Sequence, residues 1–250
     1  MARECLRLLI PPQHLLGAGA DGVFLLSAEH SRYLTKVLRY SPGAVFAVVD
    51  GVGHLWEAEL LDRERARLLQ PLDQPLCAEP APQPALVLAA AVVKRDFDLV
   101  VRMAVELGVD RLVPLLCERT AVLGQLRPER WLSIAAEAAE QCERLWLPRI
   151  EDPRPLGEVL SPSPRGAVRF WATTRQQQLP LLADQLQRLE PGIEEIWLAC
   201  GPEGGWSPSE EQLAHDEGWH PVQLGPTILR SSTACVAGAA WLSGWRASHA

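Results

Sequence analysis

Five prolines within fourteen residues divide this chain of 250 residues into two parts with different hydrophobic patterns. They occupy positions 71, 75, 80, 82 and 84, in a stretch with little periodic hydrophobicity. Proline fixes the backbone φ angle and lacks an N–H donor, so such a stretch is extended and stiff and suits a tether between domains. The sequence therefore predicts one domain over residues 1–76 and another over residues 77–250.

The first part has the pattern of a small β domain. Strand-like segments cover 5–10, 23–26, 44–50, 54–61 and 65–70, and the run Asp50-Gly51-Val52-Gly53 is typical of a hairpin turn. One helix, capped by Ser27, interrupts the strands. A compact β-barrel with one helix is the simplest packing of these segments.

The second part alternates strands and helices. Residues 85–92 form a continuous apolar run, which is typical of a strand buried on both faces of a parallel sheet. Further strands are expected at 109–116, 168–173, 193–200 and 220–224, and helices at 97–107, 130–145, 179–189 and 208–217. This order predicts an α/β domain with helices on both faces of the sheet.

Composition excludes several classes of protein. No apolar run approaches the roughly 20 residues of a membrane-spanning helix, so we expect a cytoplasmic protein with no membrane partner. The six cysteines never lie within four residues of one another, so we expect buried free thiols and no metal site. The net charge of −7 disfavours nucleic-acid binding through bulk electrostatics, and any surface for a polyanion must be local.

Two glycine-containing loops each follow an expected strand. Gly201-Pro202-Glu203-Gly204-Gly205 comes after the first, and glycines at the carboxyl end of a parallel strand let the backbone approach a ligand closely. Ser207 and Glu210 form a capping box that would hold this loop, although a GPEGG segment alone could be a tight turn. The second loop, within 224–234, delivers a lone arginine to a helix. Neither loop has the glycine spacing of a dinucleotide site or a P-loop.

These segments together resemble a known family. GPEGGWSPSE at 201–210 and LGPTILRSSTA at 224–234 are similar to the two carboxyl-terminal signatures of the RsmE family of SPOUT-class methyltransferases. Members of this family methylate N3 of a uridine in 16S ribosomal RNA. Further similar segments follow in the expected order, at 30, 37–39, 43, 106–109, 114, 118–119, 137–144 and 148.

The resemblance implies a fold, a cofactor and partners. The fold is α/β, with an amino-terminal PUA-like β-barrel that binds RNA and a SPOUT α/β domain with a carboxyl-terminal trefoil knot. The cofactor is S-adenosylmethionine, the partner is 16S ribosomal RNA in the small subunit, on the assembled 30S particle, and a homodimer completes the active site. The matching cofactor-binding residues are Thr173, Leu198, Gly201, Glu203, Gly204, Leu224, Gly225, Leu229 and Thr233.

Arg230 is the candidate catalytic residue. Methylation of uracil N3 requires loss of a weakly acidic proton, and a cation would lower the proton affinity of the base and stabilise the anion. Arg230 could instead cap a helix or pair with Glu203, and no proton acceptor is evident. Ser232 stands where the family has a glutamate, so either that carboxylate is not essential or the activity is altered. We favour the first, because the surrounding loop is intact.

Positive charge for RNA binding is local. The first forty residues hold five basic and three acidic side chains. Arg63, Arg65 and Arg67 alternate along an expected strand and would share one face, although a solvated face explains them equally. The residues expected to contact RNA are Arg3, Arg7, His30, Arg32, Lys36, Arg39, Lys94 and Arg119.

The final helix, expected over 233–246, carries small residues at Ala234, Ala237, Gly238 and Ala240. They suit either a subunit interface or tight packing within one chain. Two alternative functions stay open: a SPOUT methyltransferase acting on another RNA nucleotide, and a noncatalytic RNA-binding assembly factor that retains the fold.

Overall fold

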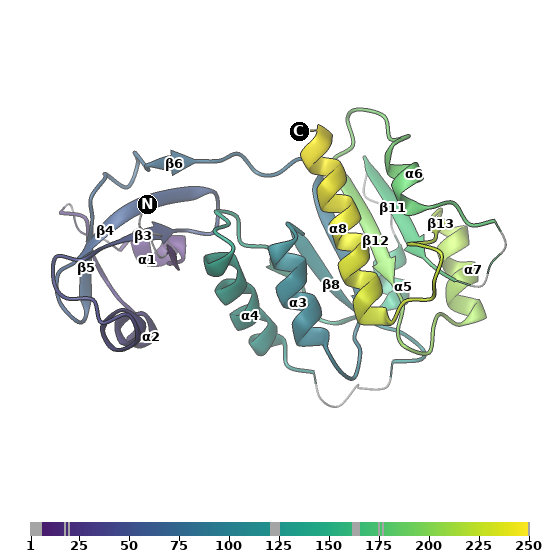
Figure 1. Cartoon of the computed structure of the whole chain (residues 1–250), viewed down its shortest axis with the longest axis horizontal. Coiled ribbons are helices and arrows are strands. Elements are labelled where there is room, and N and C mark those ends of the chain that lie inside the picture. The colour runs from purple at the N-terminus through teal and green to yellow at the C-terminus, as the bar shows by residue number, and fades with distance from the viewer. Residues whose placement is uncertain are drawn as a thin grey trace. The chain divides into compact units, whose positions relative to one another are not determined.

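The computed structural model describes residues 7–17, 19, 21–120, 126–161, 166–174, 176 and 178–249. The chain forms two compact units (Figure 1). The first comprises Met1–Ala81 and Ala139–Leu147, and the second comprises Pro82–Ala138 and Pro148–Ala250. Helix α4 (Pro128–Gln141) therefore begins in the second unit and ends in the first.

The first unit is built on a six-stranded mixed sheet of order β1-β3-β4-β5-β2, in which β6 pairs with β4. β1 runs parallel to β3, and the other pairs are antiparallel. The side chains of Leu8, Phe46 and Trp56 form part of its core. The strands are β1 (Arg7–Leu9), β2 (Val23–Leu25), β3 (Val45–Val49), β4 (His54–Leu60), β5 (Arg65–Leu68) and β6 (Cys77–Ala78). The predicted small β domain is confirmed.

The helical part of this unit begins where the sequence predicts. Ser27 caps α2 (Ala28–Arg32) by accepting a hydrogen bond from the main-chain N–H of His30 at 3.0 Å. A π-helical turn, Tyr33–Val37, continues α2, and a short helix, α1 (Pro12–Leu15), precedes β2. The prediction that Arg63, Arg65 and Arg67 share one face of a strand is wrong for Arg63, which lies in the turn before β5.

The predicted hairpin turn between β3 and β4 is confirmed. Gly51 and Gly53 both have positive φ. The buried Asp50 carboxylate accepts from the main-chain N–H groups of Val52 and His54 and pairs with the His54 ring at 2.7 Å. The segment Ala139–Leu147 reaches this turn, where the N–H of Gly53 donates to the carbonyl of Leu145 at 3.1 Å.

The second unit is built on a seven-stranded parallel sheet of order β10-β8-β7-β12-β11-β13, in which β9 pairs with β8. The five predicted strands are confirmed, with small shifts at their ends. The strands are β7 (Ala85–Ala91), β8 (Arg111–Leu116), β9 (Arg149–Ile150), β10 (Arg154–Pro155), β11 (Ala167–Ala172), β12 (Glu195–Cys200) and β13 (His220–Val222). The remaining helices are α3 (Phe97–Glu106), α5 (Leu156–Leu160), α6 (Leu182–Leu186), α7 (Pro208–Asp216) and α8 (Ser231–His249).

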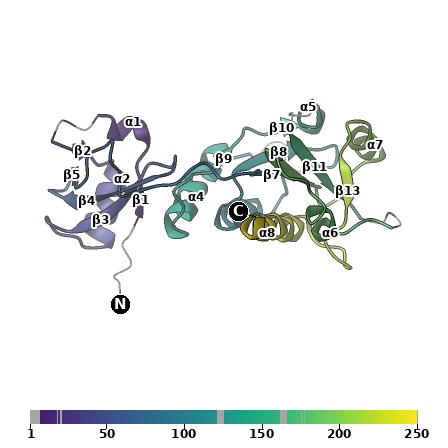
Figure 2. The same ribbon diagram turned by 90° about the horizontal axis from the view of Figure 1, so that it is seen from above.

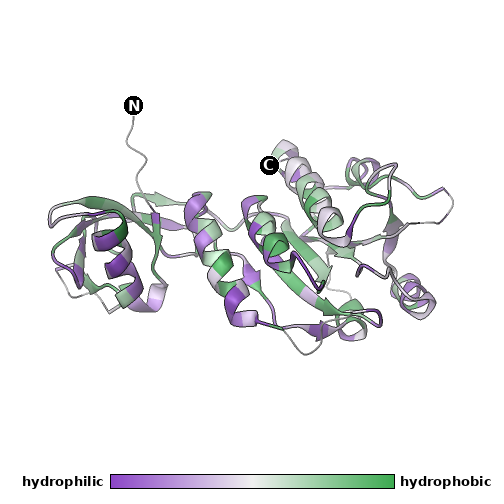
Figure 3. Cartoon of the chain, turned by 60° about the horizontal axis from the view of Figure 1, so that its bottom comes forward, coloured by the Kyte–Doolittle hydropathy of each residue, from purple (hydrophilic) through white to green (hydrophobic). Residues whose placement is uncertain are grey.

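Helices cover both faces of this sheet, as predicted. In Figure 2, α6 and α8 lie on one side and α5 and α7 on the other, and α3 packs against α8. The central strands β7 and β12 are buried from end to end except at their first residues, and Figure 3 shows strands of this sheet as hydrophobic. This burial explains their uninterrupted apolar sequences. The helix expected at 179–189 is shorter than predicted, because α6 has five residues.

Within the described residues, no helix combines the length and apolar character needed to cross a membrane. The described cysteines are free thiols, as predicted. The prediction that the cysteines are buried is wrong for Cys77, which is exposed, and is confirmed for Cys117, Cys200 and Cys235. Burial, with Glu210 nearby, raises the pKa of the Cys117 thiol to about 12, so this thiol is unreactive at neutral pH. Cys5 lies outside the described residues.

Candidate functional site

The candidate site lies where the parallel strands of the second unit end. β7, β8, β11, β12 and β13 run in the same direction, so the loops that follow them meet at one edge of the sheet. These loops contain the two glycine segments that the sequence singles out. Crevices at this edge are the usual ligand sites of open α/β sheets.

The loop of residues 201–206, hereafter the 201–206 loop, is tied to its surroundings by hydrogen bonds from three residues, Lys94, Arg119 and Ser231. The main-chain N–H of Lys94, after β7, donates to Glu203 Oε1 at 3.2 Å. Arg119 Nη1, after β8, donates to the carbonyl oxygens of Gly204 and Trp206 at 2.9 and 3.0 Å. The hydroxyl of Ser231, the first residue of α8, donates to the carbonyl oxygen of Gly201. Three segments far apart in the sequence thus fix one loop.

Trp206, the last residue of the loop, attaches the loop to the end of β11. Its indole stacks on Trp171 with ring centroids 3.8 Å apart, and its Nε1 donates to the carbonyl oxygen of Ala172 at 2.8 Å. A Cβ at Gly201 would lie 2.9 Å from the Trp206 ring, closer than real Cβ contacts allow. Glycine is therefore required at 201 by a close approach within the chain.

The predicted capping box at the start of α7 is confirmed. Glu210 N–H donates to the Ser207 hydroxyl at 3.2 Å, and Ser207 N–H donates to Glu210 Oε2 at 2.8 Å. The other oxygen of Glu210 accepts from the main-chain N–H of Glu118 at 2.8 Å. The cap therefore also joins α7 to the segment after β8, a link with no local signal in the sequence.

The side chains of two predicted cofactor residues, Thr173 and Leu198, contact other parts of the protein. The hydroxyl of buried Thr173 donates to Glu211 Oε1 at 2.8 Å. The side chain of Leu198 is fully buried and faces Gly238 of α8. The Thr173 hydroxyl and the Leu198 side chain are therefore already engaged within the protein, so a ligand at this edge would meet the main chain near these residues more readily than their side chains.

The second glycine loop, residues 223–230, leads into α8. Leu224, Gly225 and Leu229 are half-buried, and Thr233 is exposed. A Cβ at Gly225 would meet no atom within 4 Å, so the space beside this glycine is open. The loop therefore offers apolar side chains around an accessible stretch of backbone.

Arg230 is exposed at the amino end of α8, where its carbonyl oxygen accepts from the N–H of Ala234 at 2.8 Å. Among the described ion pairs none joins Arg230 to Glu203. Glu203 instead accepts from the Lys94 main chain. Ser231, beside the divergent Ser232, provides the hydroxyl that holds Gly201. Arg230 is therefore an exposed residue that directly precedes Ser231, whose hydroxyl joins the two loops.

The residues expected to contact RNA fall in both units. Arg32, Lys36 and Arg39 are exposed on or just after α2 and its π-helical turn. Arg7 pairs with Glu143 at 2.7 Å, so its charge is partly compensated. Burial holds the pKa of His30 below its usual value of 6.5. Lys94 and Arg119 belong to the second unit, and Arg3 lies outside the described residues.

Another polar cluster lies on the sheet face beside α5 and α7. It lines a cavity of about 230 Å³ with Arg111, Arg154, Arg169 and the indoles of Trp197 and Trp219. Buried Arg169 donates to the carbonyl oxygens of Leu160 and Glu217, which end α5 and α7. These two carbonyl oxygens partly offset the burial of Arg169, which lowers the pKa of its guanidinium from the usual value. No group of three potential metal ligands occurs among the residues that the structure describes.

Known proteins match this chain in both units. Residues 79–243 match the family described as RNA methyltransferase domain, and residues 26–69 match the RNA methyltransferase PUA domain. A ribosomal RNA small subunit methyltransferase E from Synechocystis sp. is 34% identical over 231 residues, covering 91% of this chain and 74% of that protein.

Solved structures show the same fold. The crystal structure of a ribosomal RNA small subunit methyltransferase E from Neisseria gonorrhoeae bound to S-adenosyl methionine has a TM-score of 0.80 and 25% identity, covering 96% of this chain and 98% of that chain. A putative methyltransferase from Legionella pneumophila in complex with SAM has a TM-score of 0.78 and 24% identity, covering 98% of both chains.

Proposed function

We propose that this chain, which belongs to the ribosomal RNA small subunit methyltransferase E family, methylates N3 of a uridine in 16S ribosomal RNA on the assembled 30S particle. Its family and folds make it an S-adenosylmethionine-dependent methyltransferase of small-subunit ribosomal RNA, with a PUA domain and a methyltransferase domain. The observation that carries the proposal is the joining of two glycine loops by Ser231 and Gly201, with Arg230 exposed beside the joint.

The cofactor would bind at these two loops. Open space beside Gly225, half-buried Leu224 and Leu229, and the exposed backbone of Gly204 fit a ligand held largely by main-chain groups and apolar contacts. Bound S-adenosylmethionine would supply the methyl group. The proposed cofactor-binding residues are Thr173, Leu198, Gly201, Glu203, Gly204, Leu224, Gly225, Leu229 and Thr233.

Arg230 would act on the uracil. N3 first loses its proton, and the electron pair left on N3 spreads onto O2 and O4 until it forms the bond to the methyl group that the cofactor would release. A guanidinium beside these oxygens stabilises that charge and lowers the pKa of the N3–H group. Proton removal could then proceed to water or to a carboxylate, for which the divergent Ser232 offers no substitute.

The basic residues of α2 and its π-helical turn would hold RNA phosphates. Arg32, Lys36 and Arg39 are exposed, as phosphate contacts require, and we propose the same role for Arg3, Arg7, His30 and Lys94. Contacts of this kind position a protein on RNA without reading its sequence. This arrangement suits a substrate recognised by the shape of an assembled particle.

We also propose a cytoplasmic homodimer with a trefoil knot in its carboxyl-terminal segment. The exposed side of α8 presents Thr233, Ala240, Trp241 and Gly244, opposite the positions that face the sheet. Small residues and one large aromatic side chain suit close packing with a second copy. The division into domains at residues 1–76 and 77–250 stays part of this proposal.

A methylation assay tests the proposal. Purified protein, labelled S-adenosylmethionine and 30S particles from a strain lacking the enzyme should give labelled 3-methyluridine, identified by nuclease digestion and mass spectrometry. Particles from the parent strain are the control, because their target is already methylated and should accept no label. A labelled product at another base would overturn the N3 assignment, and cofactor binding without any product would favour an assembly factor.

A further inference from the structure

We propose that Arg119 is a positioning residue of the cofactor site, which orders the 201–206 loop and does not contact RNA. This inference rests on the proposed location of S-adenosylmethionine at that loop. Arg119 follows β8, is exposed as a residue, and was expected from the sequence to meet RNA. Its contacts in the folded chain indicate a different role.

The guanidinium of Arg119 is engaged with the main chain of the loop. One nitrogen, Nη1, donates to the carbonyl oxygens of Gly204 and Trp206, at 2.9 and 3.0 Å. Two carbonyl oxygens on either side of Gly205 are thereby held at one point. Hydrogen bonds from a charged donor are stronger than those between neutral groups, so this contact resists opening of the loop.

The aliphatic part of Arg119 also supports the loop. A Cβ at Gly204 would lie 3.2 Å from Arg119 Cβ and 3.3 Å from its Cδ. Gly204 therefore packs directly against the arginine stem, and a side chain at 204 would have to displace it. The glycine and the arginine act as a matched pair, although 85 residues separate them.

The backbone around Arg119 is itself held by a turn after β8 and by a link to α7. Cys117 N–H donates to the Thr120 hydroxyl at 2.9 Å, and Thr120 N–H donates to the Cys117 carbonyl oxygen at 3.0 Å. On its other side, Glu118 N–H donates to Glu210 Oε1 at 2.8 Å. A residue anchored in a tight turn at the end of a buried strand can hold a glycine-rich loop in one conformation.

If Arg119 holds the 201–206 loop in its binding conformation, its replacement should lower the affinity for the cofactor. Without Arg119 the loop samples more conformations, so binding of S-adenosylmethionine must order it at a cost in affinity. Arg119→Met keeps the stem and removes the donors, and we expect about tenfold weaker S-adenosylmethionine binding by calorimetry, equivalent to about 1.4 kcal/mol. At saturating cofactor, kcat should stay close to that of the parent protein, and hydrogen exchange in 201–206 should accelerate.

Arg119→Lys separates positioning from RNA contact. Lysine keeps the charge but lacks the planar guanidinium, so it preserves attraction to phosphate better than the double contact with two carbonyl oxygens. We expect weaker cofactor binding and unchanged 30S affinity for this variant. Arg95→Met, which removes an exposed charge from the loop after β7, is the control and should leave cofactor affinity unchanged.

Two results would overturn the inference. The first is unchanged cofactor affinity together with weaker binding to 30S particles. If the salt dependence of that 30S binding also falls by about one phosphate contact, Arg119 contacts RNA. The other is a lower Tm in the absence of ligand with all kinetic parameters reduced together, which would show a general structural role. Cofactor binding is measured without RNA, so the outcome is independent of which nucleotide the enzyme methylates.

Discussion

Arg230 is the side chain on which the proposed chemistry depends. Arg230→Ala should lower kcat by about 10² to 10³, because stabilisation of a developing oxyanion by one donor contributes that much in other enzymes. Cofactor affinity should change little, since the proposed pocket is built from glycine backbone and apolar groups. Single-turnover methylation of 30S particles and calorimetry with S-adenosylmethionine measure the two quantities.

Arg230→Lys is the companion variant and should retain part of the activity, because the charge remains. Loss of cofactor affinity and activity together in both variants would instead assign Arg230 to the folding of the loop. Replacement of the divergent Ser232 by Glu tests the other half of the site. A rate increase in that variant would show that a carboxylate is useful there.

The imidazole of His30 gives a prediction about pH. Burial lowers its pKa from 6.5, with Glu29 opposing the shift and His14 adding to it. As the pH falls through 6.5, the unfolded chain takes up the proton before the folded chain does, so the free energy of unfolding should decrease. NMR titration of the His30 ring and urea unfolding across the acid range measure both effects.

His30→Gln should remove this part of the pH dependence, because glutamine does not titrate. A His30 pKa at or above 6.5 would contradict the prediction. The lowered pKa also means that His30 is neutral at physiological pH. Any contact it makes with RNA is then a hydrogen bond and not an attraction between charges.

At the residue scale, the sequence predicts contacts that are local. Ser207 and Glu210 are three residues apart, and their capping box follows from spacing alone. The contact between Arg119 and Gly204 could not be predicted, because 85 residues separate the partners and a lone exposed arginine is equally consistent with binding RNA. Trp206 was missed for the same reason, since its stacking partner is Trp171.

At the scale of elements, α8 is the helix that connects the core to the proposed site. Its buried side, which includes Cys235, Gly238 and Leu242, faces β7 and β12. A Cβ at Gly238 would lie 2.1 Å from Leu198 Cδ2, so this glycine permits the helix to approach its own sheet. The small residue at 238 therefore serves packing within the chain, one of the two roles left open by the sequence.

Gly238→Ala should destabilise the protein by about 1 to 3 kcal/mol, because the added methyl group must displace a fully buried leucine. Gly157→Ala in α5 is the matched control, since its Cβ would make only an ordinary contact of 3.8 Å with Leu213. That control should be neutral or stabilising by about 0.5 to 1 kcal/mol. Equal effects in urea unfolding would show that the close approach at 238 does not limit packing.

The elements best predicted from sequence are those whose burial leaves a pattern. β7 and β12 are apolar along nearly their whole length, and both were located within one or two residues. β9, β10 and α5 were missed, because strands of two residues and a helix of five carry too few positions for any periodicity. The π-helical turn after α2 was read as ordinary helix, since its apolar positions do not distinguish the two.

At the scale of the whole molecule, net charge conceals what the parts do. The chain carries −7, yet the first forty residues hold five basic and three acidic side chains.

The segment Ala139–Leu147 belongs to the first unit, although it follows the methyltransferase strands β7 and β8. The hydrogen bond between Gly53 and Leu145 that holds it there is nonlocal, so a linker inferred from proline content could not reveal it.

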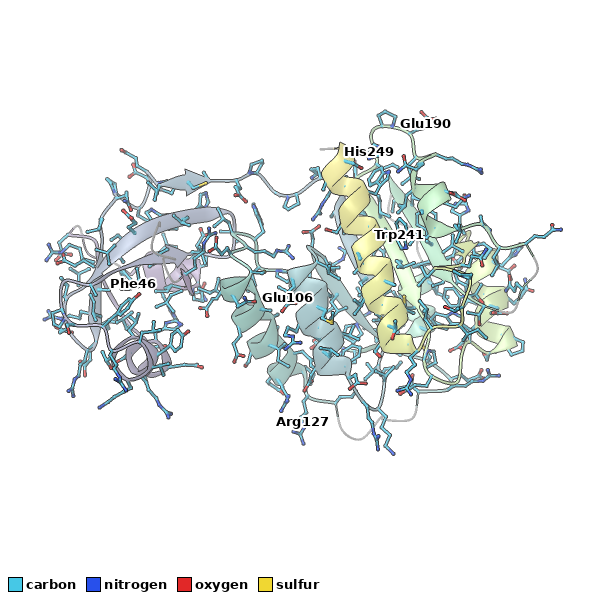
Figure 4. All side chains as sticks on the ribbon, in the orientation of Figure 1. Phe46, Glu106, Arg127, Glu190, Trp241 and His249 are labelled. Atoms are coloured by element: carbon cyan, nitrogen blue, oxygen red, sulfur yellow. The ribbon has the colours of Figure 1, made fainter. Side chains whose placement is uncertain are left out.

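The exposed side of α8 leads to a prediction about assembly. Trp241 is 48% exposed and is labelled on α8 in Figure 4. A large aromatic side chain among small residues is costly to leave in water and favourable to bury against a second copy. Trp241→Asp should therefore shift the mass measured by light scattering from about twice 27.5 kDa to a single chain.

Methylation should fall in the same variant if the partner subunit completes the active site. A Tm close to that of the parent protein would show that the monomer keeps its fold. Leu213→Asp is the control, because Leu213 is 37% exposed on α7 and is absent from the proposed interface. A Trp241→Asp protein that remains dimeric would place the interface elsewhere. The two loops joined by Ser231 and Gly201 come from a single chain. A Trp241→Asp protein that is monomeric and fully active would therefore show that one chain holds the complete site.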